Sequence, residues 1–274
     1  MYINSKHVRG WVNKQRNEWN TFEVHTVNWD SKNESACLVL PNARTLPLLV
    51  VGTTNGAQIF DMRTQKLLEQ QLIETGINVG TSIGHIMQFH CSGETSITTK
   101  KLLKEHTASI SDLATCRYDD ITCSGDCSGT INVWNKNIKG VQLKIATQHP
   151  ITAMSVLRKQ VIVGTLRGRV LFYSISGGEL MAEILAHARS ITCISVAPES
   201  AYVLTGSEDG RFIVYKLHTR KPQAYQVEYR FSDELPNCAI MGAQFTNGRG
   251  SSIAVTCFDR NAIYEYRIVK KATA

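Results

Sequence analysis

The sequence predicts an all-β protein assembled from about six copies of one small unit. Three observations predict this fold. A pair of glycines four residues apart recurs along the chain, and apolar runs rich in β-forming residues flank each pair. A third observation is the spacing of the pairs, which recur at intervals of 45 (80 to 125), 39 (125 to 164), 42 (164 to 206) and 51 (206 to 257) residues.

Each unit begins with a β-rich run that leads into a Gly, three mostly polar residues and a second Gly. Another β-rich run follows and ends near an aromatic residue such as Trp134 or Tyr215. The second Gly can take a positive φ angle without a steric clash, as a tight hairpin turn requires. The paired positions are Gly52/Gly56, Gly80/Gly84, Gly125/Gly129, Gly164/Gly168, Gly206/Gly210 and, in the last unit, Cys257/Asn261.

Further β segments complete the units on both sides of these hairpins. We expect an innermost strand at 110–116, 151–157, 191–197 and 240–246, and a fourth strand at 142–148, 179–187 and 223–231. The last two segments have helical propensity, but their place in the repeat favours strands. Four antiparallel strands in about 40 to 45 residues are typical of one blade of a β-propeller.

The second unit is predicted to be incomplete. Only 28 residues (52 to 80) separate the first two turns, which leaves almost nothing for an innermost strand. We therefore predict about six recognisable blades over residues 31–270, and a seven-bladed parent architecture is also compatible. Residues 1–30 form a basic N-terminal segment that could add an edge strand, and residues 271–274 form a tail.

These units resemble WD repeats. A His ends the link into the innermost strand at His106, His149 and His187, where that family commonly has Gly-His, and the third unit ends on Val-Trp-Asn. The resemblance implies a buried hydrogen-bonded set of His, turn Asp, strand Ser/Thr and aromatic residue. The fifth unit matches best, with His187, Asp209, Thr205 and Tyr215. No other unit has Asp at this turn position, so the sequence predicts a complete set once and degraded sets elsewhere.

The composition is that of an ordinary folded protein, with 43% hydrophobic and 19% charged residues. None of the eight cysteines forms a C-x-x-C pair, so we expect reduced thiols, no zinc site and a cytoplasmic protein. No run approaches the roughly 18 apolar residues that span a bilayer. The net charge of +7 is compatible with acidic protein partners, nucleic acid or an anionic membrane surface.

No motif for catalysis or for a cofactor emerges from the sequence. It contains no nucleotide-binding loop, GxSxG elbow, HExxH or paired carboxylates, so we predict no enzyme, cofactor or metal site. His85 and His90, five residues apart on one expected strand, face opposite sides of it. A His187–Asp209 pair could suggest a catalytic triad, but the repeat already accounts for both residues and no nucleophile is specified.

The remaining candidate site is a surface. Hairpin turns of successive units converge on one rim of a propeller, and Arg167, Arg189, Glu208 and Arg260 would lie there. Such a rim suits acidic or phosphorylated peptides. The leading hypothesis is a non-enzymatic scaffold or adaptor that binds other proteins; the alternative is a propeller that binds nucleic acid through its basic surface.

Overall fold

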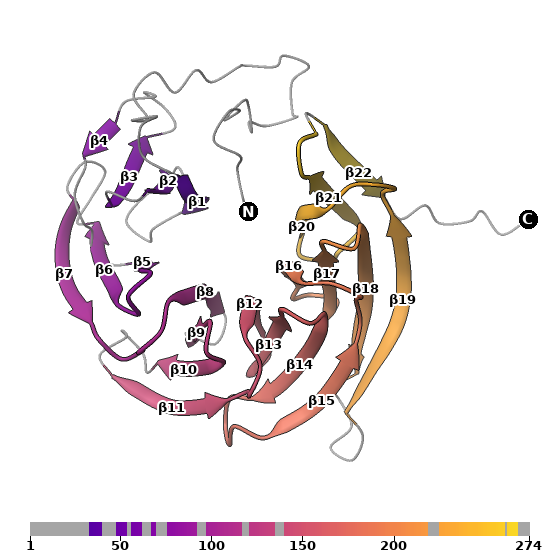
Figure 1. The fold of residues 1–274 in the computed structure, drawn as a ribbon, viewed down its shortest axis with the longest axis horizontal. Helices are drawn as coiled ribbons and strands as arrows, with labels where there is room; N and C mark the ends of the chain where they lie inside the picture. Colours follow the sequence, from indigo (N-terminus) through magenta and orange to yellow (C-terminus); the bar gives the residue numbers. More distant parts are fainter. Residues whose placement is uncertain are drawn as a thin grey trace, which may run out of the picture. The chain divides into compact units, whose positions relative to one another are not determined.

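The protein is built of β-strands. A computed structural model describes residues 33–39, 48–53, 56–61, 67–69, 76–91, 97–116, 121–134, 140–218, 225–260 and 262–267. Over these ranges the chain forms 22 strands in six antiparallel sheets and contains no helix (Figure 1). The prediction of an all-β fold made of repeated sheets is therefore confirmed. The segments expected at 1–30 and 271–274 lie outside the described residues.

The chain divides into two compact units, Met1–Val79 with Ile86–Leu103, and Gly80–His85 with Lys104–Ala274. The first holds one four-stranded sheet and nearly all of a three-stranded one. Their strands are β1 (Asn33–Val39), β2 (Leu48–Thr53), β3 (Gly56–Asp61) and β4 (Leu67–Glu69), then β5 (Gly76–Gly80), β6 (Ile86–Cys91) and β7 (Ile97–Leu103). In its described residues the sheet β5-β6-β7 has no innermost strand, as the short spacing predicted.

The second unit holds three four-stranded sheets and one three-stranded sheet, each ordered as its strands follow along the chain. The strands are β8 (Ile110–Cys116), β9 (Ile121–Asp126), β10 (Thr130–Trp134), β11 (Val141–Ala146), β12 (Ile151–Leu157), β13 (Gln160–Thr165), β14 (Arg169–Ser174) and β15 (Leu180–Leu185), followed by β16 (Ile191–Ala197), β17 (Tyr202–Ser207), β18 (Arg211–His218), β19 (Gln226–Glu234), β20 (Ile240–Phe245), β21 (Ser252–Cys257) and β22 (Ile263–Arg267). Both helix-prone segments are strands, β15 and β19, because each must pair with the strand before it in its own sheet.

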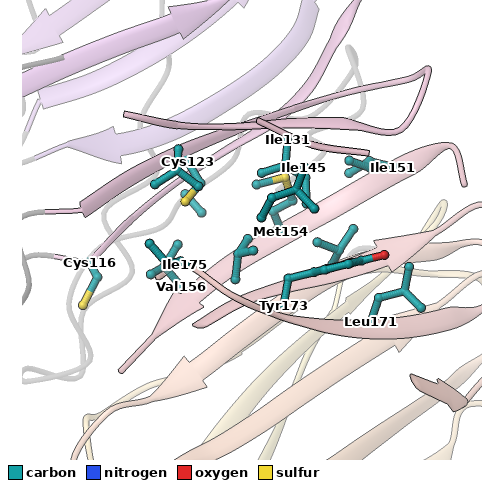
Figure 2. Packing of buried hydrophobic residues seen from close by; sticks show 14 residues of the cluster. Cys116, Cys123, Ile131, Ile145, Ile151, Met154, Val156, Leu171, Tyr173 and Ile175 are labelled. Atoms are coloured by element: carbon teal, nitrogen blue, oxygen red, sulfur yellow. The ribbon is translucent and has the colours of Figure 1, made fainter. Parts of the chain in front are cut away.

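The sheets of the second unit pack face to face through three apolar clusters. The first cluster joins the sheet β8–β11 to β12, β13 and β14; Figure 2 shows Met154 of β12 close to Ile131 and Ile145. The second joins β12–β14 to β16–β18, and the third joins β16–β18 to β20 and β21. Each innermost strand also contacts the next one, β8 with β12, β12 with β16 and β16 with β20.

The first glycine of each pair makes this packing close. A Cβ atom at Gly164 would lie 2.6 Å from Cγ2 of Ile191, the residue that begins the next innermost strand. Equivalent contacts are Gly80 to Ile110 at 2.4 Å, Gly125 to Met154 Sδ at 2.2 Å and Gly206 to Ile240 at 2.9 Å. Because real Cβ contacts are not shorter than about 3.0 Å, a side chain at these positions would push adjacent sheets apart. The repeat therefore encodes sheet-to-sheet distance as well as turns.

Candidate functional site

One end of the sheets in the second unit carries the turns between second and third strands and the connections between sheets. We call this surface the turn rim; it comprises residues 81–84, 104–109, 126–129, 147–150, 165–168, 186–190, 207–210, 235–239 and 258–260. The second glycines of the turns take positive φ angles, 74° at Gly168 and 84° at Gly210, as a hairpin of this type requires.

Backbone hydrogen bonds fix each turn to the connections beside it. Cys127 N donates to Ser109 O, and the corresponding bonds in later sheets are Leu166 N to Pro150 O, Glu208 N to Ser190 O and Phe258 N to Ala239 O. On the other side, Thr147 N, His187 N and Leu235 N donate to the carbonyl oxygens of Gly129, Gly168 and Gly210. Backbone hydrogen bonds therefore hold the turns of the rim in place, and the turns present their side chains in a fixed order.

The third unit, and not the fifth, contains the complete polar set. His106 Nδ1 lies 2.7 Å from Asp126 Oδ2, and His106 Nε2 lies 2.6 Å from Ser124 Oγ. Trp134 Nε1 donates to the same Ser124 Oγ at 2.9 Å. The prediction that only the fifth unit is complete was wrong, because Asp126 follows directly after Gly125 and not at the position of Asp209. The turn folds back far enough for either position to reach the histidine.

Hydrogen bonds define the ionisation of this set. Burial would raise the pKa of Asp126, but hydrogen bonds from Ser128, Thr130 and His106 outweigh it and lower the pKa below its ordinary value. Burial lowers the pKa of His106 despite the neighbouring carboxylate. A neutral imidazole protonated on Nδ1 then donates to Asp126, while its Nε2 accepts the Ser124 hydroxyl proton.

In the fifth unit, three of the four predicted residues come together. His187 Nδ1 lies 3.1 Å from Asp209 Oδ2, and His187 Nε2 lies 2.9 Å from Thr205 Oγ1. Tyr215 is buried, but in the described part of the chain no hydrogen bond joins it to Thr205, whose hydroxyl lies 2.9 Å from His187 Nε2 and 3.5 Å from Ile213 O. Its phenol cannot replace the indole N–H at this place, so Tyr215 contributes packing only. Asp209 also accepts from the backbone of Ala188 and Arg211.

The serine, histidine and aspartate of the third unit follow the order of a hydrolase triad, yet the geometry is structural. Ser124 is 0% exposed, and its Oγ already serves both the histidine and the indole of Trp134. A triad needs a nucleophile that a carbonyl carbon can reach. Ser124 therefore has no access to substrate. Among the described residues no cluster of His, Cys, Asp and Glu could hold a metal ion.

The four residues predicted for a partner surface all lie on the turn rim and are exposed: Arg167, Arg189, Glu208 and Arg260. Arg260 differs from the others because its Nε donates to Cys238 Sγ at 3.2 Å. Sequence reasoning missed the apolar tips of the same rim, Ile83, Leu166 and Phe258, which are 66%, 55% and 59% exposed. Their position within the turns was visible in the repeat, but their exposure was not.

Four hydrogen bonds between neighbouring sheets also carried no recognised sequence signal. Thr152 Oγ1 and Thr192 Oγ1 each donate at 2.6 Å to the first residue of the next innermost strand, the carbonyls of Ile191 and Ile240. Asp112 Oδ2 accepts from Met154 N at 2.6 Å, and Ser195 Oγ accepts from Phe245 N. These contacts connect the sheets near their inner edges, beside the close approach at the first glycines.

Comparison with known proteins agrees with this architecture. The chain is 32% identical to mouse WD repeat-containing protein 54 over 206 residues, which is 70% of this chain and 60% of the mouse protein. The human protein of the same name is 30% identical over 255 residues, 81% of this chain and 75% of the human one. The chain therefore spans less than two thirds of the mouse relative's length.

The fold itself resembles solved propellers. A chain in a crystal structure of the mitotic checkpoint complex superposes with a TM-score of 0.75 at 13% identity, covering 94% of this chain and 83% of that one. In the described part of the chain no helix is long and apolar enough to cross a membrane. The model of the WDR54 family matches residues 66–269, and the chain accordingly belongs to the WDR54 family of WD-repeat β-propeller proteins.

Proposed function

We propose that this protein is a non-enzymatic scaffold that binds other proteins through the turn rim. The observation that carries the proposal is the rim itself. Its hydrogen-bonded turns present exposed side chains, whereas its buried polar residues already bond to one another within the fold. WD-repeat propellers generally bind other proteins, and family membership supports the same role here.

The chemistry of the rim indicates the kind of partner. Arg167 and Arg189 are exposed on one turn and on the connection that lies next to it, since Gly168 accepts a hydrogen bond from His187. Arginine binds carboxylates and phosphates through two parallel hydrogen bonds. Leu166 offers an exposed apolar side chain directly beside Arg167. An acidic or phosphorylated peptide with one apolar residue would use both features.

Charge reversal tests the site. The double variant Arg167→Glu and Arg189→Glu should lose partners in affinity purification, because the rim would then repel acidic peptides. The matched control is Arg158→Glu with Arg249→Glu, which makes the same charge change at the opposite end of the sheets, where these arginines contact Pro198 O and Glu199. Equal loss in both doubles, or no loss in the first, would refute the rim as the binding site.

Crosslinking supplies an independent readout. Lys104 lies on the rim, and Lys159 lies in the turn between β12 and β13 at the opposite end; both are exposed. Partner crosslinks should concentrate on Lys104. If the protein instead binds nucleic acid, with an affinity that falls steeply as the salt concentration rises, the basic surface is a nucleic-acid-binding site. The partners are a prediction that these measurements address, while cytoplasmic location and absence of catalysis stay predictions that they do not test.

A further inference from the structure

Two cysteines and an arginine meet at the last turn of the rim. Cys238 lies in the connection between β19 and β20, Cys257 ends β21, and Arg260 lies in the turn that follows. Arg260 Nε donates a hydrogen bond to Cys238 Sγ at 3.2 Å. The two thiols also interact: burial, and then the charge and hydrogen bond of Cys238, raise the pKa of Cys257 to about 11.

Strand pairing explains why the two thiols are neighbours. Ile240 of β20 pairs with Cys257 of β21, and just beyond this pair Phe258 N donates to Ala239 O. Cys238 precedes Ile240 by two residues, which places it diagonally across from Cys257. Diagonal neighbours on an antiparallel pair are within reach of each other. Both sulfurs contribute to the same apolar cluster between the last two sheets.

The surroundings of the two thiols differ, and the difference suits each thiol to a different chemical role. Cys238 is partly exposed and receives the guanidinium N–H, whereas Cys257 is only 7% exposed. Cys238 is therefore the sulfur of the pair that solvent oxidants can reach, and it accepts a hydrogen bond from the Arg260 guanidinium. A buried thiol of raised pKa stays protonated and is protected from solvent oxidants. The pair thus has one accessible sulfur, which an oxidant can reach, and one buried sulfur, which can then form a disulfide bond with it.

We propose that Cys238 and Cys257 form a peroxide-sensitive dithiol, with Cys238 as the attacking sulfur and Cys257 as the resolving sulfur. In the first step the Cys238 thiol releases its proton and the thiolate attacks hydrogen peroxide; an S–O bond forms, the O–O bond breaks, and the hydroxide that leaves takes up the released proton as water. In the second step the Cys257 sulfur attacks Cys238; the S–S bond forms, the S–O bond breaks, and the thiol proton leaves with hydroxide as water. Two thiols and one peroxide give one disulfide and two waters.

Peroxide treatment of the whole 274-residue chain, fully reduced, tests this chemistry. After alkylation of the remaining thiols, peptide mass spectrometry should find a Cys238–Cys257 crosslink. With Cys257→Ser the first step should proceed and the second should not, so dimedone should trap a sulfenic acid on Cys238. With Cys238→Ser neither product should form. Cys257→Ala replaces Cys257→Ser if the serine variant lowers the melting temperature enough to confound the assay.

The matched control is Cys127, an exposed rim cysteine in the turn after β9. Cys127→Ser should leave the crosslink unchanged, and in the parent chain Cys127 should be oxidised more slowly than Cys238. Arg260→Gln should slow the modification of Cys238 several-fold, and Arg260→Lys should restore part of the rate. Absence of the crosslink, or oxidation of Cys127 at least as fast as that of Cys238, would overturn the proposal.

Discussion

Removal of the Asp126 carboxylate should destabilise the protein far more than removal of the Asp209 carboxylate. The two residues serve equivalent histidines, but their solvent exposure differs: the side chains of Asp126 and Asp209 are 1% and 10% exposed. Asp126 accepts from His106 Nδ1, from Ser128 N and Oγ, and from Thr130 N. Water therefore cannot easily replace the acceptor in Asp126→Ala, whereas it can in Asp209→Ala.

The magnitudes follow from these contacts. Hydrogen bonds to a charged group contribute about 1.5–3 kcal/mol each, and breaking a buried interaction of this kind costs about 3–5 kcal/mol in total. We expect Asp126→Ala to lose about 3–5 kcal/mol of unfolding free energy. For Asp209→Ala we expect about 1–2 kcal/mol, since two of its donors, Ala188 N and Arg211 N, are exposed to solvent.

Thermal unfolding followed by circular dichroism checks this difference. For a chain of this size about 2–4 °C of melting temperature corresponds to 1 kcal/mol, so the two variants should differ by several degrees. Asp126→Asn, which keeps one acceptor oxygen, should fall between Asp126→Ala and the parent. Equal losses in the two alanine variants, or a larger loss for Asp209→Ala, would refute the assignment of the complete set to the third unit.

Three further predictions concern single features of the fold. Trp134→Ala should lower the free energy of unfolding by about 3–5 kcal/mol, because the Trp134 ring is 1% exposed. Trp134→Phe should lower it by about 1 kcal/mol, because the hydrogen bond to Ser124 is lost. Urea unfolding measures both. Gly168→Ala should destabilise more than Gly178→Ala: both have positive φ, but a Cβ would lie 2.1 Å from a carbonyl oxygen at Gly168 and 3.4 Å from its nearest neighbour at Gly178. Burial raises the pKa of Asp112 from 3.8 to about 6, so the native state holds a proton that the unfolded chain releases. This residue's contribution to stability should then fall as the pH rises from about 4 to 6, and Asp112→Asn should remove that part of the slope in melting curves. An unchanged slope would show that the carboxylate ionises equally in both states.

The turns could be predicted from the sequence because a positive φ angle restricts the residue type. Gly168 and Gly210 stand where only a residue without a Cβ fits easily, so spacing alone located the hairpins and, through them, the strands. The position of Arg167 on an exposed rim followed directly. Local backbone geometry restricts the residue type at positions only a few residues apart, and such restrictions are visible in a single sequence.

The polar set and the thiol pair depend on contacts between distant residues, and their signals are weaker. Asp126 was missed because the search fixed the acid at one position of the turn, although a carboxylate two residues earlier reaches the same imidazole. His106 and Trp134 together could have prompted a search of the whole turn for the missing acid. No comparable sequence signal pairs Cys238 with Arg260, because a contact between side chains 22 residues apart imposes no recognisable pattern on the sequence.

The two polar sets also bear on how function evolves on such a scaffold. The buried set of the third unit leaves no freedom for its residues, since each atom of Ser124 and His106 that can bond is already engaged. The side chains of Arg167 and Leu166 on the rim, by contrast, are exposed and make no comparable hydrogen bonds within the described chain. Substitution of the exposed rim side chains Arg167 and Leu166 therefore costs little stability, while substitution of a buried residue such as Asp126 costs several kcal/mol. Binding specificity can change at the exposed tips because the fold does not depend on their side chains, which is the physical reason to seek this protein's partners at the turn rim.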